Sequence, residues 1–145
     1  MSNALFVYGT LMQDTNSAMA RFLHQRATSL GTAYITGRLY DLGSYPGAVY
    51  DEKETKFITG QVYELEEPKA VFPILDRYEG VSQSPMVAEE YIRKLVPAQL
   101  NNKIIYYWIY LYNLDTSQLP IIASGNYLEY FQQKSDHREF IAKGR

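Results

Sequence analysis

The 145-residue chain contains no cysteine, and its 14 basic side chains nearly balance its 16 acidic ones. The lack of cysteine excludes disulfides and thiolate metal sites, and it is compatible with a reducing compartment. Lysine and arginine are scattered without a run, and a net charge of −2 offers no basic surface for phosphate backbones. We therefore expect no nucleic-acid partner.

Long apolar runs are absent as well. The longest, IIYYWIYLY at 104–112, falls well short of the roughly 20 residues that a membrane-spanning helix needs. No basic, apolar leader rich in small residues opens the chain. We expect a cytoplasmic protein with no membrane partner.

Metal, nucleotide and hydrolase signatures are also missing. His24 and His137 are far apart and lack metal-ligand spacing, so we expect no metal site. The chain has no GxGxxG or phosphate-binding loop, no GxSxG turn and no Ser/His/acid pattern. The sequence therefore gives no evidence for nucleotide binding or for a serine hydrolase.

Tyrosine is unusually abundant, with 14 copies in a chain that is 46% apolar. Tyrosine favours half-buried pleated surfaces, so this enrichment predicts a sheet-rich protein. The length fits one ordinary domain, and no repeat or linker divides the chain, so we expect a single domain over 1–145.

Apolar patterning predicts more strands than helices. The expected strands are 5–8, 32–42, one following the turn in GSYPGAVY at 43–50, 57–65, 89–97 and 103–112. The expected helices are 15–27, 67–80 and a short one within 124–134, followed by a peripheral tail. The prediction is an α+β fold: a small mixed β-barrel or strongly curved sheet with two or three flanking helices.

Several details of these elements can be tested. Thr15 or Asn16 is expected to cap the first helix, whose inner stripe is Met19, Phe22 and Leu23. In the strand at 57–65, Phe57, Thr59, Gln61 and Tyr63 are expected on one face, with Ile58, Val62 and Leu65 on the other. The strand at 103–112 is apolar on both faces and should lie in the middle of the sheet.

The second expected helix has residues that favour a helix start and a helix end, and it also has a proline in its interior. Pro68 suits a first helical position and Gly80 suits a C-cap. Pro73 lacks the amide donor that a continuous helix needs, so we expect a kink or a helix that restarts there. The inner stripe is expected to comprise Val71, Ile74, Leu75 and Tyr78.

The stretch LFVYGTL, residues 5–11, is the first candidate for chemistry. Gly9 follows a buried strand, where it permits a sharp turn and a close approach of the backbone to a ligand. The amides of Gly9, Thr10 and Leu11 would then form a nest for a carboxylate or oxyanion. The alternative is that Gly9 serves only a tight strand end.

The stretch LDRYEG, residues 75–80, is the second candidate. Asp76 and Glu79 are three residues apart, but such pairs at a helix end are usually solvated surface. If Glu79 follows Tyr78 toward the core, burial would raise its pKa and make it useful as a proton shuttle. Glu89 and Glu90 are interpreted as solvated, and the aromatic run around Trp108 as core.

Seven segments follow one another in a set order from Phe6 to about Tyr130: VYGTL, GRLYDLGSYPGAV, TGQVYEL, LDRYEG, YIRKLV, WIY and ASGNY. With these segments in this order, the chain resembles the gamma-glutamylcyclotransferase-like family. This family includes gamma-glutamyl and gamma-glutamylamine cyclotransferases, butirosin-pathway cyclotransferases and plant avirulence-induced proteins. Its fold is a mixed small barrel with flanking helices.

The resemblance implies an enzyme that cleaves a γ-glutamyl amide or peptide by cyclisation. It implies that the backbone amides of Tyr8, Gly9, Thr10 and Leu11 bind the carboxylate and the reacting carbonyl, and that Glu79 is the general acid/base. The products would be 5-oxoproline and a free amine, and the reaction would need no metal or cofactor. The alternative that we keep is a non-catalytic module that binds a small carboxylate or a γ-glutamyl metabolite.

Some positions depart from the family pattern or have no assigned role. Asn126 and Tyr127 stand where many relatives have Asp and Trp, and Gln13 stands near where relatives often have Gly. The remaining matched residues without a role are Arg38, Tyr45 and Arg93, for which a structural and a ligand-binding role stay open. The sequence identifies neither the leaving amine nor the oligomeric state.

Overall fold

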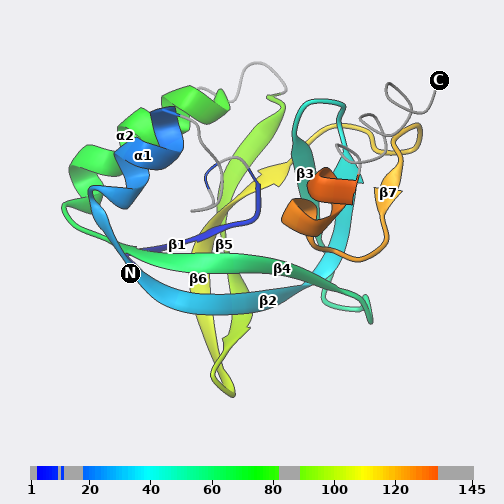
Figure 1. Cartoon of the computed structure of the whole chain (residues 1–145), viewed down its shortest axis with the longest axis horizontal. Helices are drawn as coiled ribbons and strands as arrows, with labels where there is room; N and C mark the ends of the chain where they lie inside the picture. The colour runs from blue at the N-terminus through cyan, green and yellow to red at the C-terminus, as the bar shows by residue number, and fades with distance from the viewer. Residues whose placement is uncertain (1–2, 10, 12–17, 82–88, 134–145) are drawn as a thin grey trace.

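The computed structural model describes residues 3–9, 11, 18–81 and 89–133 (Figure 1). In chain order the elements are β1 (Ala4–Val7), α1 (Ala18–His24), β2 (Ala27–Asp41), β3 (Pro46–Tyr50), β4 (Phe57–Leu65), α2 (Pro68–Glu79), β5 (Tyr91–Leu100), β6 (Lys103–Tyr112) and β7 (Ile121–Ile122). A helical segment follows at residues 127–133.

Five strands close into a barrel in the order β2, β4, β1, β6 and β5, with β5 returning to pair with β2. β1 runs parallel to β6, with Leu5 opposite Trp108, and the other strand pairs are antiparallel. β3 and β7 pair with the last residues of β2. The predicted α+β fold with a small mixed barrel and flanking helices is therefore confirmed.

Two apolar clusters explain why β1 is buried along its whole length. Phe6 and Tyr8 belong to an interior cluster that draws residues from all five barrel strands. Leu5 and Val7 belong to a helix-side cluster, where the outside of the barrel packs against α1 and α2 (Figure 1). A strand covered on both faces reads as a continuous apolar run, which is what residues 4–8 show.

The strand at 57–65 has the predicted bounds, but one side chain was placed on the wrong face. Ile58 and Val62 lie in the interior cluster as expected. Leu65 packs with Tyr63 in the helix-side cluster instead of joining them. The two-residue period of a strand puts residues 63 and 65 on the same side.

β2 is longer than predicted, and α1 is correspondingly shorter. β2 begins at Ala27 instead of Thr32, and it has a register shift between Ser29 and Gly31. This irregularity, with Gly31 at φ 122°, interrupts the alternation that marks a strand in the sequence. The expected caps Thr15 and Asn16 lie outside the described residues.

α2 is one continuous helix with Pro68 in its first turn and Gly80 as a left-handed C-cap, as predicted. Of the two alternatives predicted at Pro73, a helix that restarts there is wrong, because the exposed proline sits within the helix, and a kink stays a prediction. The predicted stripe is wrong at two positions: Ile74 is 38% exposed and Tyr78 is 44% exposed, while Phe72 is buried. Helical periodicity alone does not decide between neighbouring faces.

The predicted hairpin between β5 and β6 is confirmed. Asn101 and Asn102 both have positive φ, 51° and 65°, as a two-residue type I′ turn requires. β6 lies between β1 and β5, which agrees with its predicted central position. Its first residues, including Ile104 at 73% exposure, extend with the hairpin beyond the barrel (Figure 1).

Candidate functional site

A cavity of about 350 Å³ opens where β1 ends. Its wall combines the end of β1, the last turn of α2, the segment that leads into β3, and the starting residues of β5. Of the predicted site residues, Tyr8, Gly9, Leu11 and Glu79 line it, while Thr10 lies outside the described residues. Two stretches that are about 70 residues apart in the sequence thus share one cavity.

Gly9 is required here by close packing. A β-carbon at Gly9 would lie 2.7 Å from Cγ and 3.0 Å from Cδ of Pro46, which is also in the cavity wall. Gly9 is not among the glycines with positive φ, so no left-handed turn accounts for it. Its missing side chain lets the strand end pass directly against the start of β3.

Tyr8 anchors this strand end from inside the barrel. Its hydroxyl donates a hydrogen bond to the backbone carbonyl of Tyr110 and accepts one from the amide of Ala48 at 3.2 Å. Burial, above all, and the charge of Glu79 raise the pKa of the Tyr8 phenol far above its ordinary value. The hydroxyl therefore stays protonated and holds the backbone of residues 8 and 9 in place.

Glu79 is the last residue of α2 and is half-buried in the cavity wall. The helix stops here because Gly80 adopts φ 73°, while the amide of Val81 donates to the carbonyl of Asp76 at 2.7 Å. Burial, and secondarily the charge of Glu90, raise the pKa of Glu79 to about 7. This carboxyl can therefore both take up and release a proton near neutral pH.

Glu90 is a cavity residue that the sequence interpretation missed. It lines the cavity, half-buried, and accepts a 2.7 Å hydrogen bond at Oε1 from the hydroxyl of Tyr45. The prediction that Glu90 is simply solvated is therefore wrong. Tyr45 is 45 residues away in the sequence, so no local pattern marks the pair. The described lining residues include two carboxylates and no lysine, arginine or histidine.

Asp76 was predicted to be solvated, which is also wrong. Its side chain is only 14% exposed and accepts a bidentate pair from Arg93, at 2.8 Å to Oδ1 and 3.2 Å to Oδ2. The hydroxyl of Tyr110 donates to the same Oδ1 at 2.7 Å. The Arg93 guanidinium also lies over the rings of Phe72 and Trp108. Trp108 is therefore part of the packing, as interpreted from the sequence.

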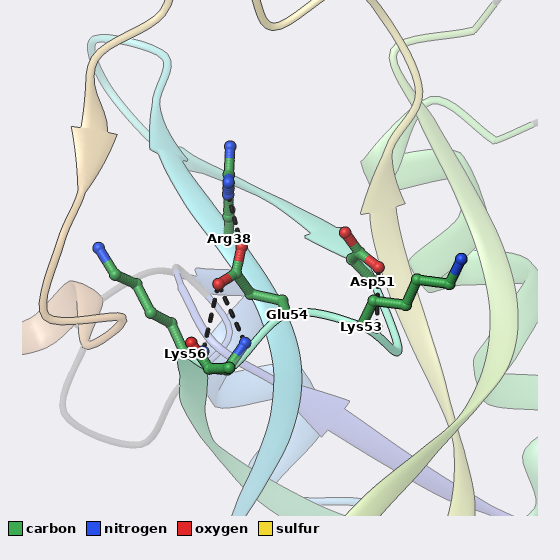
Figure 2. A network of polar contacts seen from close by, with 6 residues as sticks. Arg38, Asp51, Lys53, Glu54 and Lys56 are labelled. Carbon is green, nitrogen blue, oxygen red and sulfur yellow. Dashed lines mark hydrogen bonds and ion pairs between the residues drawn. The ribbon is translucent and has the colours of Figure 1, made fainter.

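Arg38, Asn126 and Tyr127 are not among the residues that line the cavity. Arg38 on β2 donates from Nε to Glu54 Oε2 at 2.7 Å, in an exposed polar network (Figure 2). Asn126 Oδ1 accepts from the amide of Glu129 at 3.1 Å and so caps the helical segment that begins at residue 127. Tyr127 is buried in the interior cluster. Gln13 is outside the described residues.

Within the described ranges, no three histidine or acidic side chains gather as a metal site would require. His24 packs edge-on against Tyr63, and His137 falls in the undescribed tail. No helix in the described part of the chain is long and apolar enough to cross a membrane.

Comparison with known proteins places these features in a family. A family model described as "Gamma-glutamyl cyclotransferase, AIG2-like" matches residues 5–129. Among curated proteins, no sequence gives a significant match.

Three solved structures are similar in fold. Protein ytfP of Escherichia coli is 29% identical, with a TM-score of 0.61 over 88% of this chain and 97% of that one. YkqA of Bacillus subtilis is 25% identical, with a TM-score of 0.67; all of this chain matches 44% of YkqA, so it spans less than half the length of that protein. An AIG2-like protein of Mus musculus is 19% identical, with a TM-score of 0.58 over 79% of this chain and 89% of that one.

Proposed function

The chain belongs to the gamma-glutamyl cyclotransferase, AIG2-like family, and from this premise we propose that it cleaves a γ-glutamyl amide by intramolecular cyclisation. The α-amine of the γ-glutamyl group attacks its own γ-carbonyl carbon. The products are 5-oxoproline and a free amine. The reaction is an internal transfer that consumes no water, because the new C–N bond replaces the one that breaks.

The observation that carries this proposal is the position of Glu79. Its carboxyl lies in the wall of the cavity that the backbone of Tyr8 and Gly9 also lines, and its pKa is about 7. Among the described residues, no hydrogen bond or ion pair of this carboxyl is found, and Glu79 lines the cavity. The α-ammonium of a γ-glutamyl group is a weaker acid than Glu79, so a carboxyl whose pKa is raised toward neutrality is a better proton acceptor for it than an ordinary carboxyl.

In the proposed reaction, Glu79 takes part in every proton transfer. Ionised Glu79 accepts a proton from the α-ammonium, which frees the nitrogen lone pair to attack. As the tetrahedral intermediate forms, its oxygen becomes negative, and backbone amides at the end of β1 would stabilise it. Glu79 then returns its proton to the leaving nitrogen while the old C–N bond breaks. The ionised Glu79 next takes the second proton from the new ring nitrogen, which leaves a neutral lactam, and passes it to the released amine. One carboxyl thus serves as base and then as acid.

The surroundings of the strand end support the proposed oxyanion role. Tyr8 is held by two hydrogen bonds, and Gly9 packs directly on Pro46, so the backbone is fixed before a ligand arrives. Donors that are already oriented need no reorganisation as charge develops. The proposed contribution of Thr10 and Leu11 rests on the family resemblance.

The test is a product assay with a matched variant. Purified protein is incubated with γ-glutamyl-ε-lysine, γ-glutamyl dipeptides and glutathione, and 5-oxoproline is quantified by mass spectrometry. Glu79→Gln, which is nearly isosteric, should lower turnover by roughly 10²- to 10⁴-fold while the protein stays folded. Glu64→Gln, at an exposed position on β4 outside the cavity lining, is the control for loss of a carboxylate.

Two results would contradict the proposal. An unchanged rate in Glu79→Gln would remove Glu79 from the mechanism. Saturable binding of a γ-glutamyl compound with no 5-oxoproline from the unmodified protein would favour the binding module.

A further inference from the structure

The proposed acid/base lies on α2, and the proposed amide donors lie at the end of β1. Tyr110 of β6 forms hydrogen bonds with residues of both parts. Its backbone carbonyl accepts the hydrogen bond from the Tyr8 hydroxyl. Its own hydroxyl donates to Asp76 Oδ1 at 2.7 Å, three residues before Glu79 on α2. One residue therefore connects the strand that ends at Gly9 with the helix that ends at Glu79.

Arg93 completes this connection from β5. Two of its guanidinium nitrogens donate hydrogen bonds to the carboxylate of Asp76. The centre of the guanidinium lies 4.2 Å from the ring centroid of Phe72 and 4.5 Å from that of Trp108. A planar guanidinium that is both paired and stacked has little freedom to rotate. Because Phe72 is on α2 and Trp108 is on β6, the stacking also spans the junction between helix and barrel.

We propose that Tyr110, together with Asp76 and Arg93, is a positioning device that holds Glu79 at a fixed place relative to the backbone of Tyr8 and Gly9; this role rests on the proposed function. We call these three residues the α2 clamp. None of them is proposed to exchange a proton with the substrate.

Directionality is the physical reason for this assignment. The remaining contacts of α2 with the barrel are largely apolar, through Val71, Phe72 and Leu75. Apolar contacts stabilise without fixing a direction, whereas charge-assisted hydrogen bonds fix both distance and angle. Residues three apart lie on neighbouring positions of one helix face, so holding Asp76 also holds the turn that carries Glu79.

The protonation states suit a fixed contact. Burial, above all, and the hydrogen bond to Asp76 raise the pKa of the Tyr110 phenol far above its ordinary value, so its hydroxyl remains a donor. Asp76 faces the cation of Arg93 as well as this donor, so its carboxylate is satisfied without the help of Glu79. The hydrogen bonds of the clamp thus do not involve the carboxyl of Glu79.

Position is expected to matter more than stability for the reaction. A displacement of about 1 Å in a reacting group can cost on the order of 100-fold in rate. Tyr110→Phe removes only the hydroxyl, leaving the backbone carbonyl for Tyr8 and the Arg93 pair for Asp76. We expect a drop of about tenfold in kcat with KM changed less than about twofold, because a loosened helix end lowers the fraction of aligned complexes.

Tyr107→Phe is the matched control. Tyr107 is a buried tyrosine on the same strand, but it belongs to the interior cluster and does not line the cavity. Loss of its hydroxyl should leave kcat and the pH profile as in the unmodified protein. If both variants lose the same activity in proportion to their loss of thermal stability, the clamp is only structural and the proposal is overturned.

A second readout does not depend on turnover. The Glu79 carboxyl is titrated by ¹³C NMR in the unmodified protein, Tyr110→Phe, Tyr107→Phe and Arg93→Lys, the last of which keeps the charge but loses the bidentate fork. The proposal expects the Glu79 pKa to move in Tyr110→Phe and Arg93→Lys and to stay fixed in Tyr107→Phe. A pKa that is unchanged in both clamp variants overturns it.

The two experiments separate the possible failures. If the unmodified protein yields no 5-oxoproline, the proposed function fails, and the NMR titration alone decides whether the clamp sets the surroundings of Glu79. If Tyr110→Phe does not fold, Arg93→Lys carries the same comparison.

Discussion

Gly9 and Pro46 touch so closely that a β-carbon on Gly9 would lie 2.7 Å from Pro46 Cγ. This contact joins the end of β1 to the start of β3, and both residues line the cavity. The proline ring cannot swing away as a flexible side chain would. The strand-end backbone therefore depends on the absence of a side chain at residue 9.

Gly9→Ala should lower the free energy of unfolding by about 1–3 kcal/mol, because the added methyl group overpacks this contact. It should also raise KM, since the proposed amide donors would shift with the strand end. Urea denaturation and steady-state kinetics measure the two effects. The double variant Gly9→Ala/Pro46→Ala should recover much of both losses, and strict additivity of the single variants would contradict the packing explanation.

Glu90→Gln should move the acidic limb of the kcat/KM profile to lower pH. The charge of Glu90 raises the pKa of Glu79, so removing that charge lowers this pKa and lets Glu79 act as a base in more acidic solution. Tyr45→Phe is the control, because it removes the hydrogen bond to Glu90 but keeps both carboxylates. A limb that stays in place or moves to higher pH in Glu90→Gln would count against the electrostatic coupling.

Glu79→Gln should stabilise the protein, and more so at pH 8 than at pH 4. The pKa of Glu79 rises from 4.5 to about 7 on folding, so the native state holds a proton that the unfolded chain releases between these values. Stability from this group is present below about pH 4.5 and is lost as the pH rises through about 7. One pKa unit corresponds to about 1.4 kcal/mol, so at pH 8 the free energy of unfolding of Glu79→Gln should exceed that of the unmodified protein by about 3 kcal/mol.

The measurement is urea denaturation of both proteins from pH 4 to pH 8. Glu64→Gln, at an exposed position, should show no comparable trend. The stability difference between Glu79→Gln and the unmodified protein should grow with pH. If it does not, ionisation of Glu79 does not lower the free energy of unfolding, and the prediction is wrong.

Arg38→Gln should leave kcat/KM unchanged. Arg38, whose side chain is 53% exposed, pairs with Glu54 (Figure 2). Neither residue lines the cavity. Exposed ion pairs contribute little to stability, so only a small change in melting temperature is expected. A large rise in KM for a γ-glutamyl substrate would instead assign Arg38 to binding.

The parts of the fold that local patterns encode were predictable from the sequence. β4, the ends of α2 at Pro68 and Gly80, and the β5–β6 hairpin each follow from alternation, capping or turn chemistry. The predicted burial was wrong where helical periodicity fits two neighbouring faces equally well, as on α2, where Phe72 is buried instead of Ile74. Errors also arose where a bulge breaks the pattern, as at Gly31.

The candidate site was predictable only in part, for a related reason. Gly9 and Glu79 stand out beside a buried strand and at a helix end, so local reasoning reached them. Asp76 and Glu90 appeared solvated because their partners, Arg93, Tyr110 and Tyr45, are 17 to 45 residues away. Their surroundings exist only once the barrel has closed.

The parallel pairing of β1 with β6 also bears on how the protein folds. Leu5 lies opposite Trp108, and the Tyr8 hydroxyl reaches the carbonyl of a residue 102 positions later. During synthesis, this edge of β1 has no partner until the chain has been extended as far as β6, since Tyr110 lies 102 positions after Tyr8. Contacts of such long sequence separation slow folding. The β6-facing edge of this apolar strand therefore stays unpaired until late in the synthesis of the barrel, which exposes it to aggregation while the chain is incomplete.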